Sequence, residues 1–302
     1  MDTDDKATPR KSAKDFDQRI LEIFDGYVHG RMTKREFIER AGKYAAAGVT
    51  GAMLLDQLRP DYALAQQVAP DDPAIVTETA SYDSPQGNGR ISGLMARPAA
   101  ATGKLAAVLV VHENRGLNPY IADVVRRVAK AGYLAFGPDG LSPLGGYPGT
   151  DDQGREMQAS LDPAKLMADF FAAFEFLRGH DRSTGKVGAV GFCYGGGVCN
   201  ALAVAYPDLA ASVPFYGRQP AAEDVPKIEA PLMLHYAGLD ERINAGWPAY
   251  EAALKANGKT YEAFVYEGVN HGFHNDTTPR YEPAAAELAW SRTLGHFARY
   301  LG

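Results

Sequence analysis

The stretch that most constrains the fold is a glycine-rich turn, Gly191-Phe192-Cys193-Tyr194-Gly195. An apolar run precedes it and an Ala-rich segment follows, which predicts a sharp passage from strand to helix at one residue. The flanking glycines lack a Cβ and let neighbouring backbone approach closely. The apex residue, Cys193, would lie beside a helix N-terminus, where the helix dipole and free N–H groups favour a thiolate. Taken alone, the motif also fits a small buried cysteine.

Patterns typical of strands and helices alternate through the chain after residue 70. The predicted strands cover residues 75–82, 90–97, 106–112, 134–136, 186–190, 211–216, 231–236 and 261–266. The predicted helices cover residues 120–131, 161–178, 198–206, 247–256 and 282–300, with a glycine- and proline-rich loop at 141–149. Opening strands followed by strand–helix alternation predict an α/β fold whose mainly parallel central sheet is flanked by helices. Functional side chains in such sheets lie beyond the carboxyl ends of the strands.

Polar side chains follow the ends of four predicted strands, among them Cys193, Asp240 and His271. These three occur in the chain order nucleophile, acid, histidine, which is the order of α/β-hydrolases. In acyl transfer the cysteine attacks the acyl carbon, the histidine moves the proton, and the aspartate fixes the imidazole tautomer. Singly, Asp240 could cap a helix and His271 could be an ordinary loop histidine. Together they predict a catalytic triad.

At these residues the sequence resembles the dienelactone hydrolase family of α/β-hydrolases. The resemblance covers roughly residues 75–301 and rests on four segments, His112-Glu113-Asn114-Arg115-Gly116, 191–196, Ala237-Gly238-Leu239-Asp240 and His271-Gly272-Phe273. It implies hydrolysis of a small-molecule carboxylic ester or lactone through an acyl-thioester on Cys193. We expect no cofactor. No H-E-x-x-H pattern or paired-cysteine spacing supports a metal site, so none is expected.

The resemblance also implies roles for three neighbours of Cys193. In the family a glutamate contacts the cysteine and takes part in forming the thiolate, a role that falls here to Glu113. A carboxylate is normally the weaker base, so it would accept the thiol proton only when substrate binding shifts the balance. The alternative is a buried salt bridge from Glu113 to Arg115. The oxyanion hole is expected at the backbone N–H groups of Asn114 and Tyr194.

Carboxylate recognition departs from the family pattern. The family holds a substrate carboxylate with arginines, but the loop at 141–147 has none, and the first arginine after the histidine is Arg280. Arg280, His274 and Tyr147 are the candidate substrate-binding residues, although His274 could equally be a loop histidine with ordinary hydrogen bonds. Two other functions stay open. One is a general carboxylesterase without lactone preference, and the other is a non-catalytic binding or assembly module.

Residues 1–69 form a separate N-terminal extension before the catalytic domain at 70–302. Helices are expected at 15–29, 34–47 and 51–58, the second opened by a capping box from Thr33 to Glu36. The extension would pack on the main domain or on a second subunit, which would make a homo-oligomer. Alternatively, Thr33-Lys34-Arg35-Glu36-Phe37-Ile38 is a degenerate twin-arginine export motif, with cleavage after Ala65.

Composition narrows the class and compartment of the protein. The chain has 302 residues and a formal net charge of -6, and no basic stripe appears, so a nucleic-acid partner is not expected. No uncharged apolar run is long enough to predict a membrane span. The two cysteines, Cys193 and Cys199, are poorly placed to bridge, and such sparse cysteine fits a reducing compartment. We therefore expect a cytoplasmic protein, with periplasmic export as the alternative.

Overall fold

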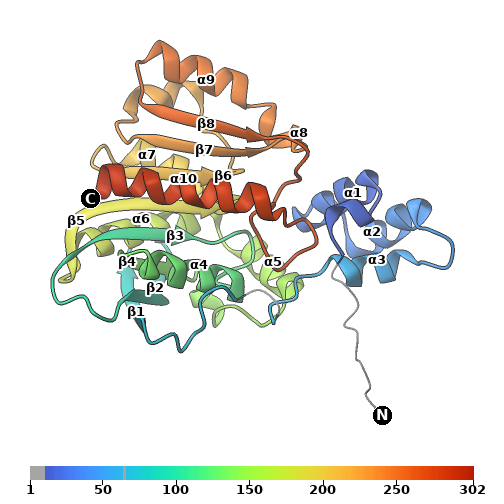
Figure 1. Ribbon diagram of the computed structural model, residues 1–302, viewed down its shortest axis with the longest axis horizontal. Helices are drawn as coiled ribbons and strands as arrows, with labels where there is room; N and C mark the ends of the chain where they lie inside the picture. The colour runs from blue at the N-terminus through green and yellow to red at the C-terminus, as the bar shows by residue number, and fades with distance from the viewer. Residues whose placement is uncertain (1–10, 64–65) are drawn as a thin grey trace.

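The computed structural model describes residues 11–63 and 66–302. Within these residues, eight strands form one sheet with helices on both faces (Figure 1). The strands are β1 (Ile75–Ser84), β2 (Gly89–Pro98), β3 (Leu105–Val111), β4 (Leu134–Pro138), β5 (Ser183–Phe192), β6 (Ala211–Phe215), β7 (Leu232–Ala237) and β8 (Tyr261–Tyr266). The order across the sheet is β1-β2-β4-β3-β5-β6-β7-β8.

The strand directions bring the segments that follow β3, β5, β7 and β8 to one edge of the sheet. Strand β2 pairs antiparallel with both β1 and β4, and the strands from β4 through β8 run parallel. The carboxyl ends of β3, β5, β7 and β8 therefore point the same way. The predicted α/β fold, with a mainly parallel sheet flanked by helices and with helices at the N-terminus, is confirmed.

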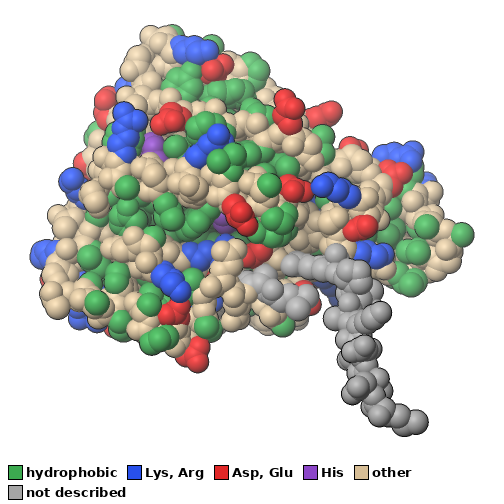
Figure 2. All heavy atoms as spheres, viewed as in Figure 1, with side chains coloured by type: hydrophobic (Ala, Val, Ile, Leu, Met, Phe, Trp, Pro, Cys, Tyr) green, Lys and Arg blue, Asp and Glu red, His purple; other side chains and the backbone are tan. Residues whose placement is uncertain are grey.

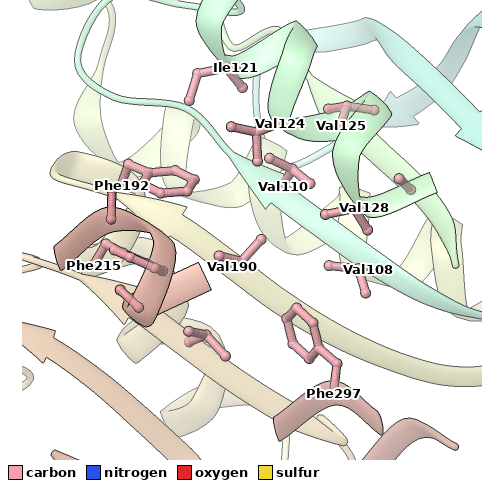
Figure 3. Packing of buried hydrophobic residues seen from close by; sticks show 14 of the residues in the cluster. Val108, Val110, Ile121, Val124, Val125, Val128, Val190, Phe192, Phe215 and Phe297 are labelled. Carbon is pink, nitrogen blue, oxygen red and sulfur yellow. The ribbon is translucent and has the colours of Figure 1, made fainter. Parts of the chain in front are cut away.

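Two apolar layers hold the helices against the sheet. Side chains alternate along β3, so Val108 and Val110 face one layer while Leu109 and Val111 face the other. The first layer packs under α4 (Pro119–Lys130) and α10 (Pro283–Leu301), as Figure 3 shows for the valines of α4 and for Phe297. The second layer packs under α6 (Pro163–Gly179), α7 (Tyr194–Ala205) and α9 (Trp247–Ala256). The central strands β3, β4, β6 and β7 are therefore buried on both faces, whereas the edge strands β1 and β8 are partly exposed.

The N-terminal helices form a small unit beside the sheet domain (Figures 1 and 2). It comprises α1 (Gln18–Val28), α2 (Lys34–Ala41) and α3 (Gly51–Leu58), with short 3₁₀ turns at Ala13–Asp15 and Gly42–Tyr44. Its own apolar cluster is centred on the fully buried Phe37 and Leu58. The capping box predicted at Thr33 and Glu36 is present, with both reciprocal hydrogen bonds. We call this unit, residues 11–58, the N-terminal unit.

Two helices differ from expectation. Helix α2 ends at Ala41 rather than near residue 47, because the chain turns back there and packs α3 against α2. A Cβ on Gly51 would lie 2.1 Å from the Ile38 carbonyl oxygen, so the two helices meet backbone to backbone. Helix α5 (Asp151–Ser160) was not predicted because its sequence is largely polar and it buries only Gly154 and Gln158.

The remaining elements are short and lie in the loops. They are the 3₁₀ turns Ser142–Leu144 and Ala222–Lys227 and helix α8 (Glu241–Asn244). Cys193 and Cys199 are both unpaired, as expected. Leu64 and Ala65, which complete the expected cleavage pattern, lie outside the described residues. Among the helices that the structure describes, none has the length and apolar character needed to cross a membrane.

Candidate active site

The turn at Cys193 has the backbone strain of a nucleophile elbow. Cys193 stands between β5 and α7 with φ 56° and ψ −111°, a conformation that side chains rarely adopt outside functional sites. A Cβ on Gly191 would lie 2.2 Å from the Gly195 carbonyl oxygen, and one on Gly195 would lie 2.3 Å from that of Val111. Only glycine fits at either position. The sulfur is consequently presented at the carboxyl edge of the sheet, beside the first turn of α7.

His271 and Asp240 form a tightly bonded pair next to this elbow. Nδ1 of His271 lies 2.5 Å from Oδ2 of Asp240, and both side chains are buried. Because a carboxylate only accepts, Nδ1 carries the proton and Nε2 is left available. Nε2 has no hydrogen-bond partner among the described residues. A ring nitrogen of His271 lies within 4.8 Å of Cys193 Sγ. The structure thus brings the three predicted triad residues together.

Glu113 follows β3 and is buried behind the elbow. Its Oε2 lies 3.6 Å from Nη2 of Arg115 and accepts a hydrogen bond of 3.2 Å from Asn275 Nδ2. Burial raises the pKa of Glu113, and the guanidinium of Arg115 counteracts part of this effect. Arg115 is also bonded to Asp151 of α5, at 2.8 Å. The salt bridge considered in the sequence is therefore present, and the contact of Glu113 with the thiol stays a prediction.

The two amides predicted for the oxyanion hole belong to residues that line the acyl pocket together. Tyr194 is the first residue of α7, and Asn114 lies in the loop after β3. Within the described part of the chain, neither backbone N–H donates a hydrogen bond. The side chain of Asn114 has a separate task, since its Nδ2 donates 2.7 Å to the Val28 carbonyl at the end of α1. An oxyanion hole at these amides remains a prediction that the arrangement permits.

The N-terminal unit supplies a residue that the sequence did not suggest. His29 ends α1, and its Nε2 lies 3.2 Å from Cys193 Sγ. Its Nδ1 lies 2.7 Å from the Asp25 carbonyl and 3.1 Å from Asp25 Oδ1. The only local signal is the spacing of four between Asp25 and His29, which places them on one helix face. Nothing in the sequence shows that this face meets a site more than 160 residues away.

Two pockets open on either side of the end of α1. One, of about 430 Å³, is lined by Asp240, His271 and Arg280, together with Asp25 and Arg31 of the N-terminal unit. We call it the arginine pocket. The other, of about 620 Å³, is lined by Asn114, Tyr194 and His29, by apolar side chains of α1 and α6, and by mostly polar side chains of α5. We call it the acyl pocket. Cys193 itself is only 8% exposed, and His29 is one of the side chains in contact with its sulfur.

The three candidate substrate-binding residues lie in different surroundings. Arg280 is 4% exposed and lines the arginine pocket, where its Nε and Nη1 have no hydrogen-bond partner among the described residues. His274 lies in the core, stacked on Phe192, with its Nδ1 2.7 Å from the Tyr120 hydroxyl. Tyr147 lines a separate cavity of about 370 Å³ next to the N-terminal unit. Of the three, Arg280 alone shares a pocket with His271.

A metal was not expected, but three side chains of types that bind metals lie close together at the elbow. Ligand atoms of His29, Cys193 and His271 lie within 4.8 Å of one another, and thiolate with imidazole is a donor set that suits zinc. A cation bound there would sit next to Arg242, whose Nη2 lies 3.3 Å from His29 Nε2. It would also occupy the sulfur that the elbow presents. The absence of a metal at these side chains stays a prediction.

The imidazoles change the acidity of the thiol. Burial by itself would raise the pKa of Cys193, but the positive charges of His29 and His271 hold the pKa well below its usual range. Burial would likewise lower the pKa of His271, yet the Cys193 thiolate and the bond to Asp240 raise it to about 10. The two shifts have one cause, an ion pair at the elbow. Cys199 differs, because burial alone raises its pKa.

A mainly parallel sheet with a cysteine elbow, followed by an acid and a histidine at the same edge, defines an α/β-hydrolase. Comparisons with known proteins narrow the class. The model of the Dienelactone hydrolase family matches residues 91–301, which is more than half of the chain. A YqhI-like family model matches residues 8–46, in the N-terminal segment. The chain belongs to the dienelactone hydrolase family, whose members are carboxylic ester hydrolases.

Individual relatives agree with this family. A hydrolase fragment of Escherichia coli K12 named YghX is 60% identical over 115 residues, 38% of this chain and 98% of that protein. A Bradyrhizobium protein named "Probable 2-oxo-3-(5-oxofuran-2-ylidene)propanoate lactonase" is 32% identical over 73% of this chain and 95% of its own. The crystal structure of a protein described as a dienelactone hydrolase from Klebsiella pneumoniae superposes with a TM-score of 0.65 at 27% identity. It covers 74% of this chain and 100% of its own.

The depressed thiol pKa predicts an unusual alkylation profile. We expect iodoacetamide to label Cys193 at a nearly constant rate from about pH 6 to about pH 9. The rate for an ordinary cysteine would rise about tenfold per unit below its pKa. Peptide mass spectrometry after timed labelling measures the rate at each cysteine. Cys199, which is fully buried, is the internal control and should react only after denaturation. A tenfold rise in Cys193 labelling per pH unit between pH 6 and 8 would contradict the ion pair.

Proposed function

We propose that this chain hydrolyses a carboxylic ester or lactone through an acyl-thioester on Cys193. The observation that carries the proposal is the strained cysteine elbow with the buried Asp240–His271 pair beside it. A hydrolysis that used a bound water alone would need no such elbow. The family membership supports the reaction class, and the named lactonase relative supports lactones as one substrate type.

In acylation, Cys193 Sγ adds to the acyl carbon and a C–S bond forms. The carbonyl oxygen takes up negative charge and accepts hydrogen bonds from the backbone N–H groups of Asn114 and Tyr194. The carbonyl then re-forms, the bond from the acyl carbon to the alcohol oxygen breaks, and His271 gives its proton to the departing oxygen. Asp240, bonded to Nδ1, keeps that imidazole in the tautomer that can carry the proton on Nε2.

In deacylation, neutral His271 takes a proton from water as the water oxygen adds to the thioester carbon. The C–S bond breaks, the acid is released, and the sulfur leaves as the thiolate paired again with the imidazolium. Asp240 stabilises the charged imidazole in both halves of the cycle. The role that the family gives to a glutamate is proposed for Glu113 as the alternative route to the thiolate, in which Glu113 exchanges its contact with Arg115 for the thiol.

The two pockets suggest how a substrate is held. The apolar side chains of the acyl pocket line it together with Asn114 and Tyr194, so this part of the pocket suits the acyl or alcohol chain of an ester. The arginine pocket places Arg280 next to His271. Among the described residues, Nε and Nη1 of Arg280 have no hydrogen-bond partner, and Nη1 forms only a long ion pair, 3.8 Å, with Asp25. A buried guanidinium with unused donors is suited to a carboxylate. We propose that Arg280 binds a carboxylate of the substrate.

Replacing Cys193 by Ala should abolish ester hydrolysis, because the bond-forming atom is lost. We expect kcat/KM to fall by at least about a thousandfold, measured on a panel of lactones and aryl esters. The matched control is Cys199→Ala, which removes the other thiol and should keep kcat/KM within about twofold. Retained turnover in C193A would refute the proposal, whereas no turnover of any ester by the wild type would favour the non-catalytic module. Equal turnover of both substrate types by the wild type would favour a general carboxylesterase.

Replacing Arg280 by Gln should weaken only substrates that carry a carboxylate. Loss of charge-assisted hydrogen bonds predicts a drop of about 10- to 100-fold in kcat/KM. A nitrophenyl ester of a dicarboxylic acid is the test substrate, and neutral nitrophenyl butyrate is the control, whose kcat/KM should change by less than about threefold. An equal loss on both esters would assign Arg280 to structure rather than to recognition.

The compartment follows from the fate of the N-terminal unit. Cleavage after Ala65 would remove α1 and its contacts with the elbow. We therefore propose that the unit is retained, in a cytoplasmic protein. Peptide mapping of the mature protein purified from its native host should recover peptides from residues 11–63. A mature chain that starts at Gln66 would show export and processing instead.

A further inference from the structure

We propose that His29, oriented by Asp25, is a second imidazole acting on the nucleophile, and that the N-terminal unit is thereby part of the catalytic site. Its Nε2 lies 3.2 Å from Cys193 Sγ, within hydrogen-bonding distance for sulfur. The cysteine thus has two histidine–aspartate pairs, one from the sheet domain and one from α1. The inference rests on Cys193 being the nucleophile of the proposed function.

The tautomer of His29 is fixed by its own helix. The two atoms near Nδ1, the Asp25 carbonyl oxygen at 2.7 Å and Asp25 Oδ1 at 3.1 Å, can only accept. Nδ1 therefore carries a proton, and Nε2 is the nitrogen that meets the sulfur. When Nε2 is also protonated it donates to the thiolate, so the contact is an imidazolium–thiolate pair. Asp25 is a positioning residue, since it touches His29 and not the reacting sulfur.

The position of His29 favours the charged form. It ends α1, where the negative end of the helix dipole stabilises a cation. Burial would lower the pKa of His29, but the charge of Cys193 and the bond to Asp25 raise it. Arg242 opposes protonation, with Nη2 at 3.3 Å from Nε2, although its side chain is 34% exposed and solvent screens it. Asp25 also pairs with Arg242, which offsets part of that repulsion.

Several other charged or titratable groups face the thiol and its two imidazoles. Within the described residues they are Asp25 on α1, Glu113 after β3, Tyr216 after β6, Asp240 and Arg242 after β7, and His271 and Arg280 after β8. Of these, only His271 is a cation-forming group paired with the thiolate in the same way as His29. A change at His29 alone therefore leaves one imidazole in place.

The sheet domain holds the end of α1 at the site. Helix C-termini leave carbonyls without helical partners, and here two of them bond to the sheet domain. Asn114 donates 2.7 Å to the Val28 carbonyl, and Arg155 of α5 donates 2.8 Å to the Tyr27 carbonyl. The Tyr27 hydroxyl donates 2.9 Å to Asp152. These bonds fix the residues immediately before His29, so the contact with Cys193 is built by several side chains.

The consequence is a thiol that is already ionised in the free enzyme. A route through Glu113 would form the thiolate only when substrate binds, whereas two imidazoles hold it at rest. The acyl carbon must approach the sulfur that His29 covers, so His29 gives up its contact as the substrate enters. After acylation the sulfur is no longer charged, and the pairing with His29 returns when the thiolate is released.

The test is the pH profile of iodoacetamide alkylation at Cys193 in the full-length chain, from about pH 4 to about pH 9. His29→Gln keeps a side chain of similar reach without its charge. Loss of an imidazolium destabilises the thiolate and raises the pKa of the thiol, so the midpoint should move to higher pH. At the wild-type midpoint, alkylation of H29Q should be about fivefold slower or more. The high-pH plateau, which reports access to the sulfur, should stay within about twofold.

The controls separate charge, access and folding. His180→Gln, at the end of α6 and near the start of β5, should leave the profile unchanged. An unchanged midpoint in H29Q, or a change confined to the plateau, would overturn the inference. Should H29Q not fold, as judged by circular dichroism, His29→Asn gives the same readout. Alkylation needs no turnover. Inactivity of the wild type toward esters would therefore refute the proposed function without changing what the alkylation profile says about His29.

Discussion

The site depends on one strained residue between β5 and α7. Cys193 has a positive φ that costs about 1–3 kcal/mol relative to relaxed backbone. The conformation persists because the surroundings fix it from several sides. Its N–H donates 3.0 Å to the Phe215 carbonyl, and Gly191 and Gly195 pass close to neighbouring carbonyls where a Cβ would not fit. The sulfur is thus held at the sheet edge by backbone packing, and the ionised state of the sulfur then depends on the side chains around it.

Those side chains come from parts of the chain that are far apart. His271 and Asp240 follow two adjacent parallel strands, so the register of β7 and β8 sets their distance. His29 and Asp25 come from a helix outside the sheet, held by Asn114 and by Arg155. A buried thiolate without partners would be costly, because removing a charge from water is expensive. The imidazoles supply the compensating charge, and the N-terminal unit contributes one of them.

Much of this arrangement could be predicted from the sequence. The elbow, with Asp240 and His271 at later strand ends, has a fixed chain order and a fixed place in the sheet, and the structure brings the three together. Helix α3 occupies the residues at which it was predicted, and in the structure the side chain of Thr50 caps it. These features are local, or follow from the direction of parallel strands.

The rest depends on contacts that no local pattern shows. Helix α5 is polar, and its Gly154 is required because a Cβ there would lie 2.5 Å from the Arg115 carbonyl oxygen. His29 looks like the last residue of an amphipathic helix until the unit is placed on the sheet domain. Arg280 lies nine residues beyond His271, and only the fold of that loop brings it back to the pocket. Such positions are set by tertiary packing rather than by propensity.

The account's central claim is that Cys193 carries the acyl group during turnover. The direct measurement is mass spectrometry of the full-length protein, quenched in acid shortly after mixing with an aryl ester that it turns over. His271→Gln, which lacks the base that activates water, should prolong the life of the intermediate. We predict a mass increase equal to one acyl group, mapped to the peptide that contains Cys193. An acyl group on another residue, or none in either protein while the wild type still hydrolyses the ester, would contradict the account.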